Sequence, residues 1–164
     1  MNKLIVWKPG QAGETFNMIG EKFTVLAAGE DTASYEVFVQ IVPPGAGPPL
    51  HSHPWDEAFY VLEGEINFLT DGERLSAQTG TFVHFPAGSP HTFASRSGIA
   101  TVLSFTSRPG AAAFFRESDR VNAEFPGDAA KLFAVPAKHG VRLHESVEQF
   151  LQRARAPQPA AGRV

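Results

Sequence analysis

The sequence predicts an all-β fold, a small barrel or sandwich of short strands, followed by a short helical segment. Glycine (15) and proline (13) are too frequent for long helices, and 14 phenylalanines require a substantial packed core. Strand candidates recur roughly every 8–12 residues, which is the spacing typical of such folds. The length of 164 residues suits one domain.

The first strand candidates are β-branched or aromatic runs at residues 4–7, 22–27 and 34–42, which Gly, Asn and Asp separate. In the third run the odd positions are all apolar and the even positions are mixed, so the two faces of this strand differ. The next segment, residues 43–49, is rich in proline and glycine and predicts a rigid loop outside any strand ladder.

The central part of the chain reads as a meander that completes the barrel. Its strand candidates are residues 58–62, 65–70, 73–76, 81–85, 92–95 and 100–106. Asp71 and Gly72 predict a tight hairpin between the second and the third of these strands.

After residue 108 the pattern becomes helical. Pro109 suits the first turn of one helix, Asp128 can cap a second that ends near Gly140, and Ser146 begins a capping box for a third. These helices, at about residues 109–155, bury too little surface alone and are expected to pack on the barrel. Residues 156–164, rich in Ala, Pro and Gly, are expected to form a flexible tail.

Charge and composition exclude several classes of protein. The net charge of −3, without a long run of one sign, argues against a nucleic-acid partner. The absence of cysteine excludes disulfides, thiolate metal sites and a cysteine nucleophile. The N-terminal segment lacks the features of a signal peptide, and no apolar stretch approaches the length of a membrane span. A cytoplasmic protein with no membrane partner is therefore expected.

Four residues form a candidate metal site. His51 and His53 follow the proline-rich loop, and in an extended segment their side chains point to one face. Glu57, four residues after His53, would point to the same face of a continuous strand, although Pro54 interrupts it. His91 follows a turn rich in Pro and Gly. Taken alone, each residue fits a surface, strand or loop position better than a metal site. Together they form a mixed nitrogen and oxygen set that suits Fe, Mn, Ni, Cu or Zn, and the sequence does not separate these metals.

The spacing of these residues resembles the two sequence motifs of the cupin superfamily. The first motif, G-x5-H-x-H-x3or4-E-x6-G, is matched by Gly45, His51, His53, Glu57 and Gly64. The second motif, G-x5-P-x-G-x2-H-x3-N, is matched by Gly80, Pro86, Gly88 and His91, with Ser95 in place of the final Asn. Residues 48–51 and 59–65 extend the resemblance to single-domain cupins that are similar to quercetin 2,3-dioxygenase.

The resemblance implies a double-stranded β-helix, or jelly-roll, barrel with a short C-terminal helical appendage. It implies one cupin domain over residues 1–155, with a barrel core at about 35–107. One divalent transition metal would lie inside the barrel, with His51, His53, Glu57 and His91 as its ligands. Gly64 and Gly88 would occupy turns that other residues would strain.

Three apolar residues are candidates for the wall of a substrate pocket. Phe59 and Val61 share the face of Glu57, and Phe93 shares the face of His91. These side chains serve either as plain core or as the apolar wall of a substrate site. His84 is not assigned to a face, and a surface or supporting role is favoured over metal ligation.

The resemblance alone does not give a reaction, because cupins include dioxygenases, decarboxylases, isomerases and binding proteins. We expect a metal-dependent dioxygenase that acts on a small aromatic or phenolic, flavonol-like substrate, with Glu57 as the catalytic base. A non-catalytic cupin that binds a small ligand and a metal-assisted isomerase or lyase are the alternatives. Single-domain cupins usually pair, so a homodimer is expected.

Overall fold

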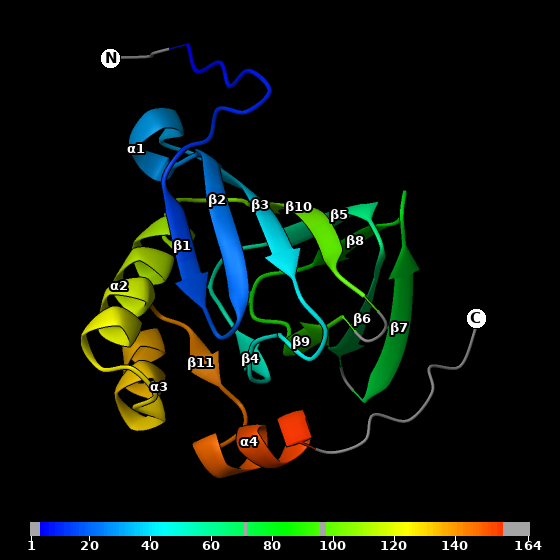
Figure 1. Cartoon of the computed structure of the whole chain (residues 1–164), viewed down its shortest axis with the longest axis vertical. Coiled ribbons are helices and arrows are strands. Elements are labelled where there is room, and N and C mark those ends of the chain that lie inside the picture. Colours follow the sequence, from blue (N-terminus) through cyan, green and yellow to red (C-terminus); the bar gives the residue numbers. More distant parts are fainter. Residues whose placement is uncertain (1–3, 71, 96–97, 156–164) are drawn as a thin grey trace.

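The computed structural model describes residues 4–70, 72–95 and 98–155, and its strands form two antiparallel sheets (Figure 1). The larger sheet has the order β1-β2-β3-β10-β5-β8. Its strands are β1 (Thr15–Met18), β2 (Glu21–Ala27), β3 (Glu36–Val42), β10 (Ala100–Thr106), β5 (Glu57–Glu63) and β8 (Phe82–Phe85). The smaller sheet has the order β11-β4-β9-β6-β7. Its strands are β11 (Arg142–Leu143), β4 (His51–Ser52), β9 (His91–Ala94), β6 (Glu65–Thr70) and β7 (Glu73–Gln78). The predicted all-β jelly-roll fold is confirmed.

The two sheets pack face to face around aromatic side chains. Phe59 from β5 lies 5.2 Å from Phe68 of β6 and 5.4 Å from Phe93 of β9, measured between ring centroids. Because alternate strand residues point to opposite faces, Phe59 and Val61 both enter this core and are fully buried. The core therefore holds the strands that carry the candidate site in a fixed relation.

The turn between β5 and β6 shows why the first motif ends in glycine. Gly64 has φ +82°, and a Cβ atom there would lie 2.6 Å from the carbonyl oxygen of Ile99. Gly88 likewise has φ +83° in the turn before β9. Both glycines occupy the strained turns that were predicted for them.

The inner and outer faces of β3 invert the usual distribution of polarity. Glu36, Phe38 and Gln40 point inward and are buried, whereas the apolar residues between them are half-buried on the outer face. On that outer face Leu103 of β10 lies between Val39 of β3 and Tyr60 of β5 in the strand register. An apolar strip therefore crosses the outside of the larger sheet, and it requires a cover or leaves hydrophobic surface exposed.

The described residues also form four helices: α1 (Gly29–Thr32), α2 (Ala111–Glu124), α3 (Ala129–Lys138) and α4 (Val147–Arg155). Helix α2 packs beside β1, and α3 packs on α2 (Figure 1). The Asp128 side chain accepts a hydrogen bond from the backbone N–H of Lys131, as a helix cap should. Ser146 and Gln149 form the predicted capping box at the start of α4.

A buried carboxylate fixes the start of α2 against the sheet. Glu36 accepts hydrogen bonds from the backbone N–H groups of Gly110 and Ala112 through Oε2, at 3.2 and 3.1 Å. Its Oε1 accepts a third from Gly29 at 3.0 Å. These donors are among those that a helix leaves unpaired at its N-terminus, so Glu36 supplies the partners that the helix lacks.

The prediction of a strand at residues 4–7 was wrong. This segment is irregular, and Leu4, Val6 and Trp7 are exposed. The free edge of β2 is taken instead by β1, and Trp7 is held by a 2.8 Å hydrogen bond from its indole N–H to the carbonyl of Leu26. Asp71 of the predicted hairpin and the predicted tail at 156–164 lie outside the described residues.

Within the described ranges, no helix has the length and apolar character needed to cross a membrane.

Candidate metal centre

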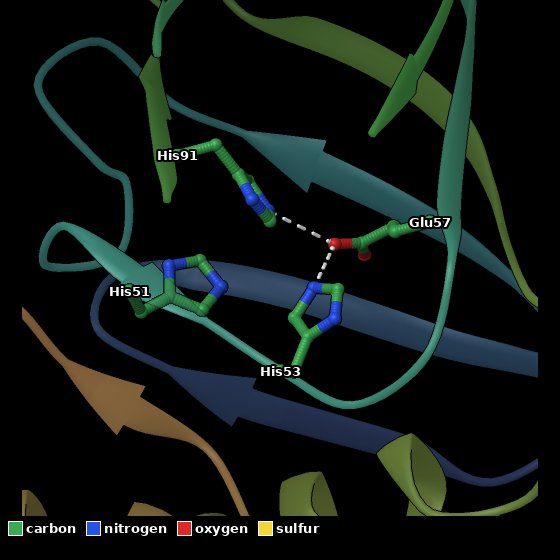
Figure 2. Close-up of side chains that lie close together, drawn as sticks. All are labelled: His51, His53, Glu57 and His91. Atoms are coloured by element: carbon green, nitrogen blue, oxygen red, sulfur yellow. Dashed lines mark hydrogen bonds and ion pairs between the residues drawn. The ribbon is translucent and has the colours of Figure 1, made fainter. Parts of the chain in front are cut away.

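His51, His53, Glu57 and His91 converge inside the barrel (Figure 2). Each contributes one nitrogen or oxygen, and these ligand atoms all lie within 4.8 Å of one another. His51 on β4 is paired directly with His91 on β9, while Glu57 begins β5. His53 lies in the loop between β4 and β5, where its carbonyl accepts a 2.8 Å hydrogen bond from the N–H of Gly88. The two sequence motifs therefore meet at this one point.

Each histidine is oriented by its own backbone surroundings. The ring N–H at Nδ1 of His51 donates to the carbonyl of Pro49, at 2.9 Å. That of His53 donates to the carbonyl of Trp55, at 2.8 Å, and that of His91 donates to the carbonyl of Ser89, at 3.0 Å. A carbonyl can only accept, so these three bonds assign the proton to Nδ1 and leave the Nε2 lone pairs free for a ligand role.

The contacts of Glu57 test whether this donor set fits a metal ion. Its Oε2 lies 2.8 Å from Nε2 of His53 and 3.2 Å from Nε2 of His91. A carboxylate oxygen also only accepts, so these contacts are favourable only when a proton or a cation lies between Oε2 and each ring. Two buried imidazolium rings with centroids 5.0 Å apart repel each other. One divalent cation supplies the same positive charge, and the residues therefore fit a metal.

Burial and neighbouring charges set the protonation of the cluster. Burial, followed by the nearby charge of His91, lowers the pKa of His51 to about 3, so this ring is neutral at physiological pH. Burial acts to raise the pKa of Glu57, but the hydrogen bonds from His53 and His91 outweigh it and hold that pKa far below its usual range. A neutral imidazole and an ionised carboxylate are the forms that bind metal ions.

Aromatic side chains fix two of the histidine rings. The ring of Trp55 stacks on His53 at 4.6 Å with an interplanar angle of 10°. Phe85 of β8 stacks on His91 at 4.4 Å and 11°. Such contacts hold a ligand in one rotamer and exclude water from its face. The sequence signal for Phe85 was available, because it has the same inward parity as Val83 on a short strand.

A cavity of about 60 Å³ lies beside the cluster and reaches toward the helices. His51 and Glu57 line one part of it. Its wall is mostly apolar and includes Phe23, Phe93, Phe114, Phe115, Leu132 and Phe133. Of the three predicted pocket residues, Phe93 lines this cavity, whereas Phe59 and Val61 lie in the core between the sheets. The helical segment, and not only the barrel, thus closes the space in front of the cluster.

The other histidines lie outside the cluster. His84 is exposed on the outer face of β8, opposite Ala58. His139 contacts Glu117 at the end of α3, and His144 contacts the hydroxyl of Ser52. The favoured surface role of His84 agrees with this position.

Three polar residues that the motifs did not indicate also line the cavity: Glu21, Gln40 and Ser118. All three are almost completely buried. The parity of Glu21 with Phe23 and Val25 places it on the inner face of β2, and this pattern was readable in the sequence. Ser118 comes from α2, and no local pattern links that helix to the barrel interior.

Comparison with known proteins agrees with this geometry. Residues 38–106 match the cupin domain family. Over 96 residues the chain is 31% identical to quercetin 2,3-dioxygenase of Bacillus subtilis. The aligned residues make up 57% of this chain and 28% of that protein. Over 67 residues it is 37% identical to dimethylsulfoniopropionate lyase DddQ of Ruegeria pomeroyi, which covers 39% of this chain and 31% of that protein. The chain thus spans less than a third of the length of either relative.

A solved structure supports the fold. The polyketide cyclase RemF from Streptomyces resistomycificus superposes with a TM-score of 0.57 at 21% identity, covering 65% of this chain and 82% of that one. At this identity the similarity concerns the fold alone. The matched region, 38–106, contains all four residues of the cluster and both sequence motifs. Residues 38–106 form a cupin domain, and this domain carries the cluster of three histidines and one glutamate.

Proposed function

We propose that this protein is a metal-dependent dioxygenase that acts on a small substrate with a phenolic or enolic hydroxyl group. The observation that carries the proposal is the convergence of three histidine nitrogens and one carboxylate oxygen within 4.8 Å of one another, beside an apolar cavity. His51, His53, His91 and Glu57 would hold one divalent ion of Fe, Mn, Ni, Cu or Zn. Such an ion would supply Lewis acidity toward a substrate oxygen and, if it is redox-active, electron transfer.

The chain's own residues would orient the site, accept a proton and exclude water. The three backbone carbonyls hold the histidine rings in place, so the site needs little reorganisation when substrate binds. Glu57 uses Oε2 toward His53 and His91, and it also lines the cavity. Its carboxylate is therefore the base best placed to accept the proton of a substrate hydroxyl. Phe93 and the aromatic side chains of α2 would exclude water from that step.

The size of the cavity limits the substrate. A volume of about 60 Å³ is far below the roughly 300–1,000 Å³ of sites that enclose drug-sized ligands. A fragment of a few heavy atoms fits without rearrangement. A flavonol-sized molecule would require rearrangement of the side chains that line the cavity. The geometry therefore favours a small phenol or enol over a flavonol.

Oxygen uptake tests the proposal. The protein is loaded separately with Fe(II), Mn(II), Ni(II), Cu(II) and Zn(II) and is offered a panel of catechols, small enols and flavonols. Oxygen consumption that is coupled to loss of a small substrate, with one of the redox-active metals, supports a dioxygenase. Turnover that proceeds at the same rate without oxygen contradicts it.

A metal-assisted lyase is the second candidate, and the similarity to dimethylsulfoniopropionate lyase favours it. The small cavity suits a short aliphatic substrate as well as a small phenol. The two candidates differ in one requirement, because elimination by a base such as Glu57 needs no oxidant. Anaerobic turnover of dimethylsulfoniopropionate by the metal-loaded protein would support the lyase, and a zinc-loaded protein should then also be active.

The apolar strip on the larger sheet supports a homodimer as the assembled form. On this outer face Phe82 of β8 is paired with Tyr60 of β5, and both are exposed. Burial of such a strip against a second copy would remove it from water. We also propose that residues 1–155 form one domain, since Phe23 of β2 and Phe115 of α2 contact at 4.3 Å.

A further inference from the structure

Polar side chains cross the inner face of the larger sheet in one diagonal row. Glu57 on β5 lies one step from Ser104 on β10, because the register pairs Thr106 with Glu57 and Ser104 with Phe59. The amide nitrogen of Gln40 on β3 donates a 2.7 Å hydrogen bond to the hydroxyl of Ser104. The row connects the metal cluster with the opposite side of the cavity.

Glu21 continues this row on β2. Phe23 is paired with Gln40, so Glu21, two residues before Phe23, lies diagonally next to Gln40 on the same face. Glu21 is 3% exposed and Gln40 is 1% exposed. Helix α2 brings Ser118 to the same cavity, and that side chain is 1% exposed. The cavity therefore has a polar end formed by elements outside the two cupin motifs.

These three residues share an unusual property. In the part of the chain that the structure describes, four buried side-chain polar atoms have no hydrogen-bond partner, and Asn67 Oδ1 is the one outside the cavity. The other three atoms are Glu21 Oε2, Gln40 Oε1 and Ser118 Oγ. Buried polar atoms without partners are rare because they destabilise the folded state. Three of them line one cavity, where a ligand could satisfy them.

Glu36 shows that the fold can satisfy a buried carboxylate when its role is structural. Glu36 is as buried as Glu21 and lies on the neighbouring strand. Its two oxygens accept three backbone hydrogen bonds, from Gly29, Gly110 and Ala112. Oε2 of Glu21, in contrast, has no hydrogen-bond partner. The difference separates a structural carboxylate from one that is available for binding.

The chemistry of the three groups defines what they would bind. Burial, and then the charge of Glu57, raises the pKa of Glu21 well above its ordinary value of 4.5, which favours a neutral carboxylic acid. A neutral acid both donates and accepts, Ser118 does the same, and Gln40 Oε1 only accepts. A hydroxyl group also donates and accepts, so its hydrogen-bonding chemistry matches all three groups. An ammonium group could not accept from Glu21 or Ser118.

We propose that Glu21, Gln40 and Ser118 form a second polar subsite, which binds a hydroxyl group at the far end of a ligand whose other end lies at the His51/His53/Glu57/His91 cluster. The ligand class is thus a small molecule with an apolar middle and oxygen groups at both ends. This proposal depends on the proposed function only because it places one end of the ligand at the metal cluster. It applies to a dioxygenase, a lyase or a binding protein alike.

Matched hydroxamate probes test the subsite without any turnover. The protein is loaded with Co(II), and binding is followed through the visible absorption of the cobalt. Each probe pair shares a metal-binding hydroxamate and one to three methylenes, and ends in either a hydroxyl or a methyl group. The wild type should bind at least one hydroxyl-ended probe tenfold or more tightly than its methyl-ended partner. Glu21→Leu should abolish this preference, while Glu65→Gln, at a partly exposed position on β6 that does not line the cavity, should retain it.

Thermal unfolding of the metal-free protein provides an independent test. Glu21→Leu removes an unpartnered buried carboxyl and should raise Tm, whereas Glu36→Gln should lower Tm. Equal affinity for every hydroxyl and methyl pair, or a preference for an ammonium-ended probe, would overturn the subsite. A fall in Tm for Glu21→Leu as large as that for Glu36→Gln would also overturn it. If the cobalt spectrum never forms, the metal proposal fails, and the Tm comparison still decides the role of Glu21.

Discussion

Nε2 of His53 lies 2.8 Å from Oε2 of Glu57, and both side chains are buried. Nδ1 of this histidine already donates its proton in a hydrogen bond to the carbonyl of Trp55. In the neutral ring, Nε2 therefore faces the carboxylate without a proton of its own. Only a cation or an additional proton between them makes that arrangement favourable.

Replacement of Glu57 by Gln should abolish most of the activity. The amide cannot accept the substrate proton, and loss of general base catalysis costs roughly 10²–10⁴ in rate. The measurement is oxygen uptake by wild type and Glu57→Gln at equal metal occupancy. Unchanged uptake would reject Glu57 as the base.

Metal binding should raise the stability of the protein through His91. A metal at about 1,000 times its Kd stabilises the folded state by about 4 kcal/mol. The corresponding rise in Tm should be lost in His91→Ala and retained in His84→Ala, since His84 is exposed on the outer face. Equal metal-induced shifts in both variants would contradict the assignment of His91 as a ligand.

Glu36→Gln should destabilise the protein by about 2–4 kcal/mol, because the new amide group faces backbone donors with its own N–H groups. Urea unfolding of the wild type and the variant measures this difference. A control is Glu65→Gln, at a partly exposed strand position, where little change is expected. A Glu36 variant as stable as the wild type would show that the carboxylate does not hold α2 to the sheet.

The contact between α2 and α3 should weaken in acid. Hydrogen bonds from Lys138 and then His139, each at 2.7 Å, lower the pKa of Glu117 from 4.5 to about 2. A depressed pKa means that the folded state favours the ionised carboxylate. Its stabilising effect is therefore complete above pH 4.5 and disappears as the pH falls toward 2. The Tm difference between wild type and Glu117→Gln should shrink across this range, and a constant difference would contradict the assignment.

The apolar strip should mediate self-association. Tyr60→Lys places a charge in the middle of the strip, between Leu103 and Phe82, and should convert a dimer to a monomer in light scattering. Leu75→Lys is the matched control, because Leu75 is a similarly exposed residue on β7 of the other sheet. A wild type that is monomeric at every concentration would rule out the dimer.

Much of the fold could be predicted because apolar and polar residues alternate along strands and because turn residues separate the strands. The limits of β6 (Glu65–Thr70) and β10 (Ala100–Thr106) agree with the runs read from the sequence. The cupin motifs also indicated which four residues would meet. The prediction of a strand at residues 4–7 was wrong because strand propensity does not determine which segment pairs with the free edge of β2.

The rest of the cavity depends on tertiary contacts that no local pattern encodes. Ser118 is a polar residue within an amphipathic helix, and only the packing of α2 on β1 brings it to the cavity. Phe59 shares the face of Glu57 as predicted, but the facing ring of Phe68 closes it into the core. Parity gives the face of a strand, and it does not say whether that face meets another side chain or a cavity.

Measurement of bound metal decides whether the cluster of three histidines and one glutamate is a metal site. The wild type and a His53→Ala, His91→Ala double variant are dialysed against each candidate divalent metal, and bound metal is measured by mass spectrometry after removal of the free ion. We expect close to one ion per chain in the wild type and nearly none in the double variant. Equal metal content in the two proteins, or no metal retained by the wild type, would contradict it.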